Sequence, residues 1–150
     1  MMSYTTAKSD SYHEFAEVFT PAGVVFDMIL NSGIRAVLED ADKNILDPAV
    51  GEGQFPCAEL VWKLFFNVDS LNEDLALRAL SSLYGIDIQP SNVYKSRANL
   101  VQTLCDAYKF FKGNDFTRLD EAQAIVEENI ICGDSLKLMK QWAEPQISLF

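Results

Sequence analysis

The chain has few of the residues that bind metals or form covalent cross-links. Its 150 residues include one histidine, His13, and three cysteines, Cys57, Cys105 and Cys132. The cysteines are odd in number and far apart, which argues against a disulfide framework, and no Cys/His pair has the spacing of a metal site. We therefore expect no metal, and we interpret the cysteines as small apolar core residues in a reducing compartment.

Long hydrophobic runs are also missing. No apolar run reaches the roughly 18 residues that a membrane span needs. Residues 1–10 are polar and lack the apolar segment of a secretory signal. These absences predict a cytoplasmic protein that does not contact a membrane. We expect residues 1–13 to be a loose N-terminal segment. Residues 14–150 should form a single domain, because 49% of the chain is apolar and can supply a core.

Positive charge is scarce. Lysine and arginine number 12 against 22 aspartates and glutamates, which gives a net charge of −10, and the basic residues are scattered. Proteins that bind DNA without help usually present a basic patch that neutralises phosphates. The chain alone is therefore expected to bind DNA only weakly.

The hydrophobic pattern alternates between short strands and helices. Pro90 opens a long segment with a 3.6-residue apolar period, and a helix is also expected from Thr20 to about Leu38. Strands are expected at 44–47, 83–88 and 130–132, with other helices at about 54–68, 75–80, 119–128 and 135–142, the last stopped by Pro145. Strands that alternate with helices predict an α/β fold with a parallel sheet and helices on both faces.

The most informative stretch runs from Asp47 to Phe55. It places Gly51 and Gly53 in a tight turn between a strand and a helix. Glycines let the backbone approach a ligand closely, and a helix start offers free N–H groups. The stretch therefore predicts a site for a small nucleotide-like molecule, although the glycines could also serve only the turn.

Each expected strand ends in an acid: Asp47, Asp87 and Asp134. In a parallel sheet these ends share one edge, so the acids should converge there. They suit an adenosyl ligand without phosphates: Asp87 would accept the ribose hydroxyls, Asp134 the adenine amine, and either Ile86 or Ile88 could pack on the base. The alternatives are that Asp87 only forms a turn and that Asp134 only caps a helix.

Two other nucleotide sites fit the sequence less well. A nicotinamide site would need a glycine where Pro56 stands, and Asp87 lies 40 residues after Asp47, beyond the usual spacing of about 20. The phosphate-binding pattern Gly-x-x-x-x-Gly-Lys-Ser/Thr does not occur.

Four segments, in order, resemble the S-adenosylmethionine-dependent DNA methyltransferases that modify adenine N6, a family that includes the modification subunits of restriction systems. They are Glu17–Pro21, Asp47–Phe55, Tyr84–Ile88 and Asn129–Leu136, within about residues 14–138. The resemblance implies a Rossmann-like methyltransferase fold with a partial parallel sheet, and S-adenosylmethionine or S-adenosylhomocysteine as ligand. It assigns these residues to the cofactor: Phe19, Thr20, Pro21, Asp47, Pro48, Ala49, Gly51, Gly53, Phe55, Asp87, Ile88, Asp134 and Ser135.

One departure from that family concerns catalysis. Its Asp/Asn-Pro-Pro-Tyr/Phe tetrapeptide is absent, since the chain contains no Pro-Pro pair. We therefore assign no catalytic residue and expect methyl transfer only if further chain or a partner subunit completes the site. The alternative is a non-catalytic module, a decoy or regulator of a restriction–modification system, that binds a protein partner or a second copy. Thr20 and Pro21 also have a purely structural explanation as a helix cap and a first-turn proline.

Overall fold

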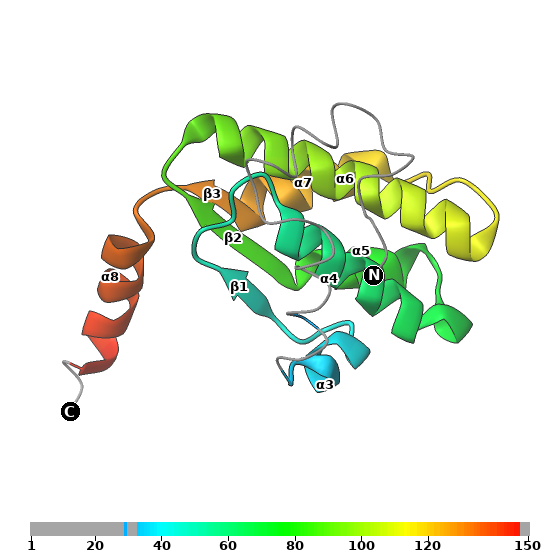
Figure 1. Ribbon diagram of the computed structural model, residues 1–150, viewed down its shortest axis with the longest axis horizontal. Helices are drawn as coiled ribbons and strands as arrows, with labels where there is room; N and C mark the ends of the chain where they lie inside the picture. Colours follow the sequence, from blue (N-terminus) through cyan, green and yellow to red (C-terminus); the bar gives the residue numbers. More distant parts are fainter. Residues whose placement is uncertain (1–28, 30–32, 148–150) are drawn as a thin grey trace, which may run out of the picture.

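The computed structural model describes Ile29 and residues 33–147, with side chains up to Gln141. Helices and strands alternate along this part of the chain (Figure 1). The elements are α3 (Arg35–Glu39), β1 (Ile45–Asp47), α4 (Gln54–Phe66), the 3₁₀ helix η1 (Val68–Ser70), α5 (Glu73–Ser81), β2 (Leu83–Asp87), α6 (Pro90–Lys112), α7 (Leu119–Asn129), β3 (Ile130–Cys132) and α8 (Ser135–Ile147). Residues 1–13 and the candidate site residues Phe19, Thr20 and Pro21 lie outside the described residues.

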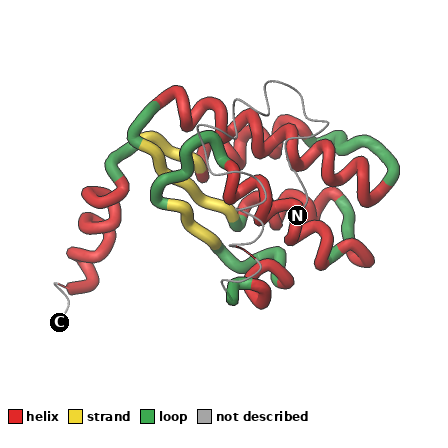
Figure 2. The backbone as a smooth tube through the Cα atoms, in the orientation of Figure 1, coloured by secondary structure: helices red, strands yellow, loops and turns green. Residues whose placement is uncertain are grey.

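The three strands form one parallel sheet in the order β1-β2-β3, with β2 in the centre (Figure 2). Helices α4 and α5 connect β1 to β2, and α6 and α7 connect β2 to β3. Parallel neighbours require such crossovers. The expected α/β class is confirmed, and the carboxyl ends of all three strands lie along one edge of the sheet.

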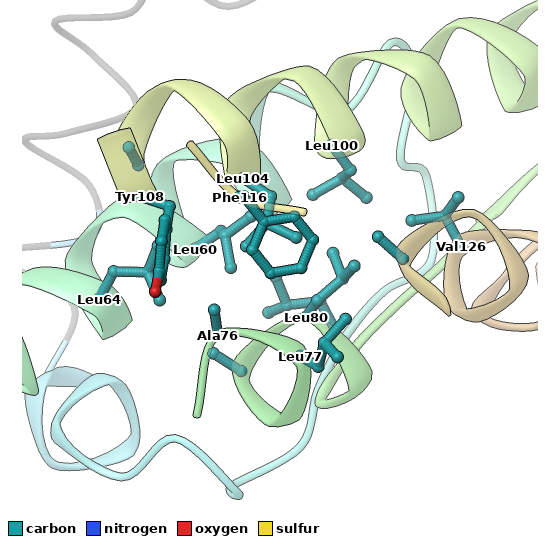
Figure 3. Close-up of a cluster of buried hydrophobic side chains, with 14 of the residues drawn as sticks. Leu60, Leu64, Ala76, Leu77, Leu80, Leu100, Leu104, Tyr108, Phe116 and Val126 are labelled. Carbon is teal, nitrogen blue, oxygen red and sulfur yellow. The ribbon is translucent and has the colours of Figure 1, made fainter. Parts of the chain in front are cut away.

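The main core joins the sheet to α4, α5, α6 and α7. Figure 3 shows side chains from all four helices meeting in one cluster, among them Leu60, Leu80, Leu104 and Val126. These four side chains are almost fully buried. Burying a leucine stabilises the fold by about 1.5–3 kcal/mol relative to leaving it exposed. The cluster therefore fixes how the crossover helices lie on the sheet.

The two faces of the sheet differ within the described residues. Leu83 and Ile130 point into the main core. Leu46 and Tyr84, which pair in register, have the opposite orientation and are 40% and 37% exposed. Helices α4 to α7 share a single core, so helices on both faces of the sheet remain a prediction.

Two helix boundaries differ from those expected. The helix expected from Thr20 to Leu38 is interrupted, because Gly33 has a left-handed φ of 79° and α3 begins only at Arg35. Pro145 does not end the last helix, which continues to Ile147. A proline removes one helical hydrogen bond, and that loss does not terminate α8. In Figures 1 and 2, α8 projects away from the other helices.

A buried lysine ties the turn before β1 to α4. Lys63 is 0% exposed, and its Nζ donates to the carbonyl oxygens of Asp40, Ala41 and Lys43 at 2.9, 3.3 and 2.7 Å. Burial lowers the pKa of Lys63 to about 8, while the charge of Asp40 opposes that change. The ammonium group thus holds the chain that leads into β1 and its terminal Asp47.

Candidate functional site

The turn between β1 and α4 requires glycine at two positions. Gly51 and Gly53 have φ values of 57° and 92°, in the left-handed region. Gly53 also faces α6, since a Cβ there would lie 3.0 Å from Ser96 Cβ and 3.2 Å from Ser96 Cα. The turn needs both glycines for its shape and Gly53 for its packing against α6. The structural explanation of Gly51 and Gly53 is confirmed, and their role toward a ligand stays a prediction.

Hydrogen bonds attach the glycine turn to β2. Val50 N–H donates to the Ile86 carbonyl, and Gly51 N–H donates to Asp87 Oδ2, both at 2.9 Å. Gly85 allows the close approach, because a Cβ on it would lie 2.7 Å from Val50 Cγ2. The backbone that would face a ligand is therefore fixed by β2.

Helix α6 holds the other side of the turn through contacts that the sequence analysis missed. Lys95 Nζ lies 3.0 Å from Glu52 Oε1, and Asn99 Nδ2 donates to the Glu52 carbonyl at 2.9 Å. Glu52 itself is buried. The signal in the sequence is the polar row formed by Asn92, Ser96 and Asn99, with Lys95 beside it, at helical spacing on one face of α6.

Asp87 organises the site more than the sequence indicated. Its carboxylate accepts hydrogen bonds from Gly51 N–H and Gln89 N–H at 2.9 Å, and from Asn92 Nδ2 at 3.2 Å. A carboxylate has about four acceptor positions, so about one stays open to a ligand. The bond from Gln89 confirms the turn-forming role of Asp87.

Asp47 lies beside Asp87 at the same edge of the sheet. Its Oδ1 accepts the Ala49 N–H at 3.0 Å. Burial is the main cause that raises the pKa of Asp47; the hydrogen bond from Ala49 opposes the rise, and the charge of Asp87 adds to it. The two acids therefore lie close enough for the charge of Asp87 to act on Asp47, in line with their expected convergence.

Asp134 follows the third strand and caps α8. Its Oδ1 accepts the N–H groups of Leu136 and Lys137 at 3.1 and 3.3 Å. The helix-cap interpretation is thus confirmed. Gly133 N–H donates to the Asp87 carbonyl at 2.9 Å, which brings the end of β3 next to the end of β2. The half-buried Ser135 begins α8 on this side.

The other predicted site residues fall into two environments. Ile88 is 68% exposed beside Asp87, as packing against a planar ring requires, and Pro48 and Ala49 are also exposed. Phe55 instead packs with the small core formed by Ile29, Leu38 and Ala58, so its contacts are structural. Apart from Phe55, the described candidates lie at the turn and the strand ends.

An open cavity of about 390 Å³ lies away from the glycine turn, lined by the start of α5, the end of α6 and the loop before α7, including Asn72, Tyr108 and Arg118. Tyr108 is about 18 Å along α6 from Ser96, at 1.5 Å per residue. The acids lie at the same edge of the sheet, and the ligand site expected beside them stays a prediction.

Glu59, on the buried side of α4, is a further acid near the turn. It is 6% exposed. Burial, followed by the charge of Asp47, raises the pKa of Glu59 to about 8, and the charge of Lys63 opposes this. The signal in the sequence is a pair of charged residues, four apart, inside an otherwise apolar helical run.

One of the three cysteines contradicts the core interpretation. Cys132 is exposed at the end of β3, while Cys57 and Cys105 are partly buried against the core. β3 is an edge strand in the described sheet, so the side chain at its end is not covered. Burial raises the pKa of Cys57 to about 11, so that thiol stays protonated at neutral pH.

The described residues thus define an α/β protein with a braced glycine turn and acids at the strand ends. Within those residues no group of histidine, cysteine and acidic side chains is arranged to hold a metal. The helices in that part are all too short or too polar to cross a membrane. Comparisons with protein-family models, curated proteins and solved structures find no match.

Proposed function

We propose that the chain binds S-adenosylmethionine as a protein related to the adenine-N6 DNA methyltransferases. The observation that carries the proposal is the glycine turn braced by β2 and α6, with Asp47 and Asp87 beside it. Such bracing supports ligand binding because a preformed site loses little conformational freedom when it is occupied. The four matching segments supply the identity of the ligand.

The residues present fit an adenosyl group in three respects. The half-buried Gly51 leaves part of the turn backbone without a side chain to block a ligand, while Gly53 is buried against α6. Asp87 keeps about one acceptor position for a ribose hydroxyl. Ile88 offers an exposed apolar surface to the base. Methyl transfer to DNA adenine additionally requires groups from further chain or a partner, because the chain lacks the tetrapeptide and carries a net charge of −10.

Isothermal titration with S-adenosylmethionine and S-adenosylhomocysteine tests the proposal, with Asp87→Asn as the site variant. The variant should weaken binding by about 10- to 100-fold, because a charged acceptor contributes about 1.5–3 kcal/mol. Asp106→Asn, an exposed position on α6, is the matched control and should bind like the wild type. The absence of binding heat at high micromolar ligand would reject the proposal, and equal affinity of the two variants would remove Asp87 from the site.

A second candidate function is a non-catalytic module that binds a protein. It is favoured by the edge of β1, which pairs only with β2 in the described sheet, and by the exposed Leu46 and Tyr84. Methylation of duplex DNA by the purified chain alone, followed with a labelled methyl group, would overturn this alternative. A chain that binds cofactor yet transfers no methyl group, and that co-purifies with a defined restriction–modification subunit, would favour it.

A further inference from the structure

The open cavity between the start of α5, the end of α6 and the loop before α7 is separate from the glycine turn. Its volume of about 390 Å³ is that of a site for a small molecule, which typically measures about 300–1,000 Å³. The described cofactor candidates, at the turn and the strand ends, do not line it. A ligand of this cavity would therefore be a second ligand of the protein.

Tyr108 contributes a buried polar group to the wall of this cavity. The residue is 4% exposed, and its ring packs edge-on against Phe116 with the centroids 5.5 Å apart. Figure 3 shows the hydroxyl oxygen at the end of the ring that points away from α6. No group of the described residues forms a hydrogen bond with this hydroxyl. Buried hydroxyls normally have a partner, so this one is available to a ligand in the cavity.

Glu73, at the start of α5, supplies a fixed negative charge to the same cavity. Its Oε1 accepts the Thr117 N–H at 2.5 Å and the Thr117 hydroxyl at 2.7 Å. These bonds, the backbone one first, lower the pKa of Glu73, so the carboxylate is ionised at neutral pH. Its second oxygen, Oε2, accepts no hydrogen bond from the described residues. Burial, and then the charge of Glu73, raise the pKa of Tyr108, so the hydroxyl keeps its proton.

The other charges at the cavity leave an excess of negative charge. The carboxylates of Glu73, Asp74 and Asp115 line it, against one guanidinium, that of Arg118. Arg118 forms an ion pair with Asp74, and Lys109 Nζ lies 3.1 Å from Asp115 Oδ1. Glu73 forms no ion pair within the described residues. The cavity therefore offers one unpaired carboxylate and one unpartnered hydroxyl.

We propose that this cavity binds a small organic amine, whose ammonium group donates hydrogen bonds to the Tyr108 hydroxyl oxygen and the Glu73 carboxylate. An ammonium group has three N–H donors and no acceptor, which matches these two acceptors. The volume leaves room for a short carbon chain behind the ammonium group. Asp115, from the loop before α7, gives the second ammonium group of a diamine an anionic neighbour. The proposal does not depend on binding of S-adenosylmethionine.

A titration of the ¹⁵N-labelled protein with 1,4-diaminobutane tests the site directly. The side-chain amides of Asn72 and Asn114 line the cavity, so their signals and that of the Thr117 N–H should shift and reach saturation. 1,4-Butanediol has a similar length without charge and should shift none of them. Magnesium chloride at the same concentration should not displace the diamine. Equal shifts with magnesium would reduce the effect to a general attraction of cations and overturn the proposal.

Two conservative variants test the two acceptors. Tyr108→Phe removes the hydroxyl and keeps the ring against Phe116, and it should weaken diamine binding by about tenfold, because a hydrogen bond to a charged group is lost. Tyr94→Phe, at an exposed position on the same helix, is the matched control and should bind like the wild type. Glu73→Gln should weaken binding at least as much. Glu128→Gln, exposed on α7, controls for a general change of charge and should keep the wild-type affinity.

The outcomes decide the proposal even if one variant fails. Equal diamine affinity of the wild type and Tyr108→Phe overturns it, and so do shifts that appear only outside the cavity. If circular dichroism shows that Tyr108→Phe does not fold, Glu73→Gln decides instead, and unchanged affinity in that variant overturns the proposal. A tenfold loss in the site variants, with both controls unchanged, supports it.

Discussion

At the level of single residues, Gly53 combines two constraints that experiment can separate. Its φ of 92° is unfavourable for a side chain, and a Cβ would meet Ser96 at 3.0 Å. Gly113, at the end of α6, has a similar φ of 80° but no atom within 4 Å of the same position. The two glycines therefore share the backbone strain and differ in the contact.

The first prediction follows from that pair. Gly113→Ala should lower the free energy of unfolding by about 1–2 kcal/mol, the cost of a left-handed conformation for alanine. Gly53→Ala should lower it by about 1–3 kcal/mol more, because the added methyl group also overpacks against α6. Urea unfolding followed by circular dichroism measures both. If both variants lose the same free energy of unfolding, the turn does not pack tightly against Ser96.

At the level of elements, α6 braces the glycine turn through its first half only. Asn99 bonds the Glu52 carbonyl, while Gln102, on the next turn of the helix, bonds only Asp106 of its own helix. The side-chain amides of Asn99 and Gln102 therefore allow a matched comparison on one helix.

Asn99→Ala should loosen the turn while leaving the fold intact. The lost hydrogen bond is worth about 1 kcal/mol, so the amides of Gly51 and Gly53 should exchange about fivefold faster with deuterium. Gln102→Ala should leave their exchange unchanged. Faster exchange in both variants would show that α6 as a whole, rather than the Asn99 contact, protects the turn.

The sequence predicted the elements better than it predicted their contacts. Strand β3 has the expected bounds, and Pro90 opens α6 as expected, because short apolar runs and a helix-starting proline are local signals. The break at Gly33 was missed because a glycine inside a helical pattern is often tolerated.

Contacts across the molecule were less predictable at the candidate site. The glycine turn and the three strand-end acids were placed correctly on one edge, since parallel strands dictate it. The engagement of Asp87 with the turn, the bracing by Asn99 and the burial of Glu59 were not foreseen. Periodicity identifies the buried face of a helix, but it does not say which group lies opposite a polar residue on that face.

At the scale of the whole molecule, Glu59 should shape the dependence of stability on pH. Its pKa is about 8 in the folded state against the ordinary value of 4.5, so between these limits the folded protein binds more protons than the unfolded chain. The contribution of this group to stability should therefore be fully present below about pH 4.5 and should fall as the pH rises toward 8, by at most about 1.4 kcal/mol per pH unit.

Chemical denaturation at pH 5.5, 6.5 and 7.5 tests this effect. Wild-type stability should decline over the series more steeply than that of Glu59→Gln, which lacks the titrating group. Glu128→Gln should follow the wild type. Parallel curves for the wild type and Glu59→Gln would mean that Glu59 is ionised in the folded protein at neutral pH.

In the described sheet, β1 has one edge without a neighbouring strand, and its length limits how strongly a further strand could pair there. The strand is three residues long, so an added strand would gain only a few hydrogen bonds of about 1 kcal/mol each. That gain is smaller than the roughly 4–15 kcal/mol that association costs in lost freedom of movement. Backbone pairing alone should therefore not recruit other chains or start edge-to-edge polymerisation. A lasting extension of the sheet therefore needs side-chain contacts as well, for example with the exposed Leu46 of β1, so side-chain fit rather than strand pairing selects what can join it.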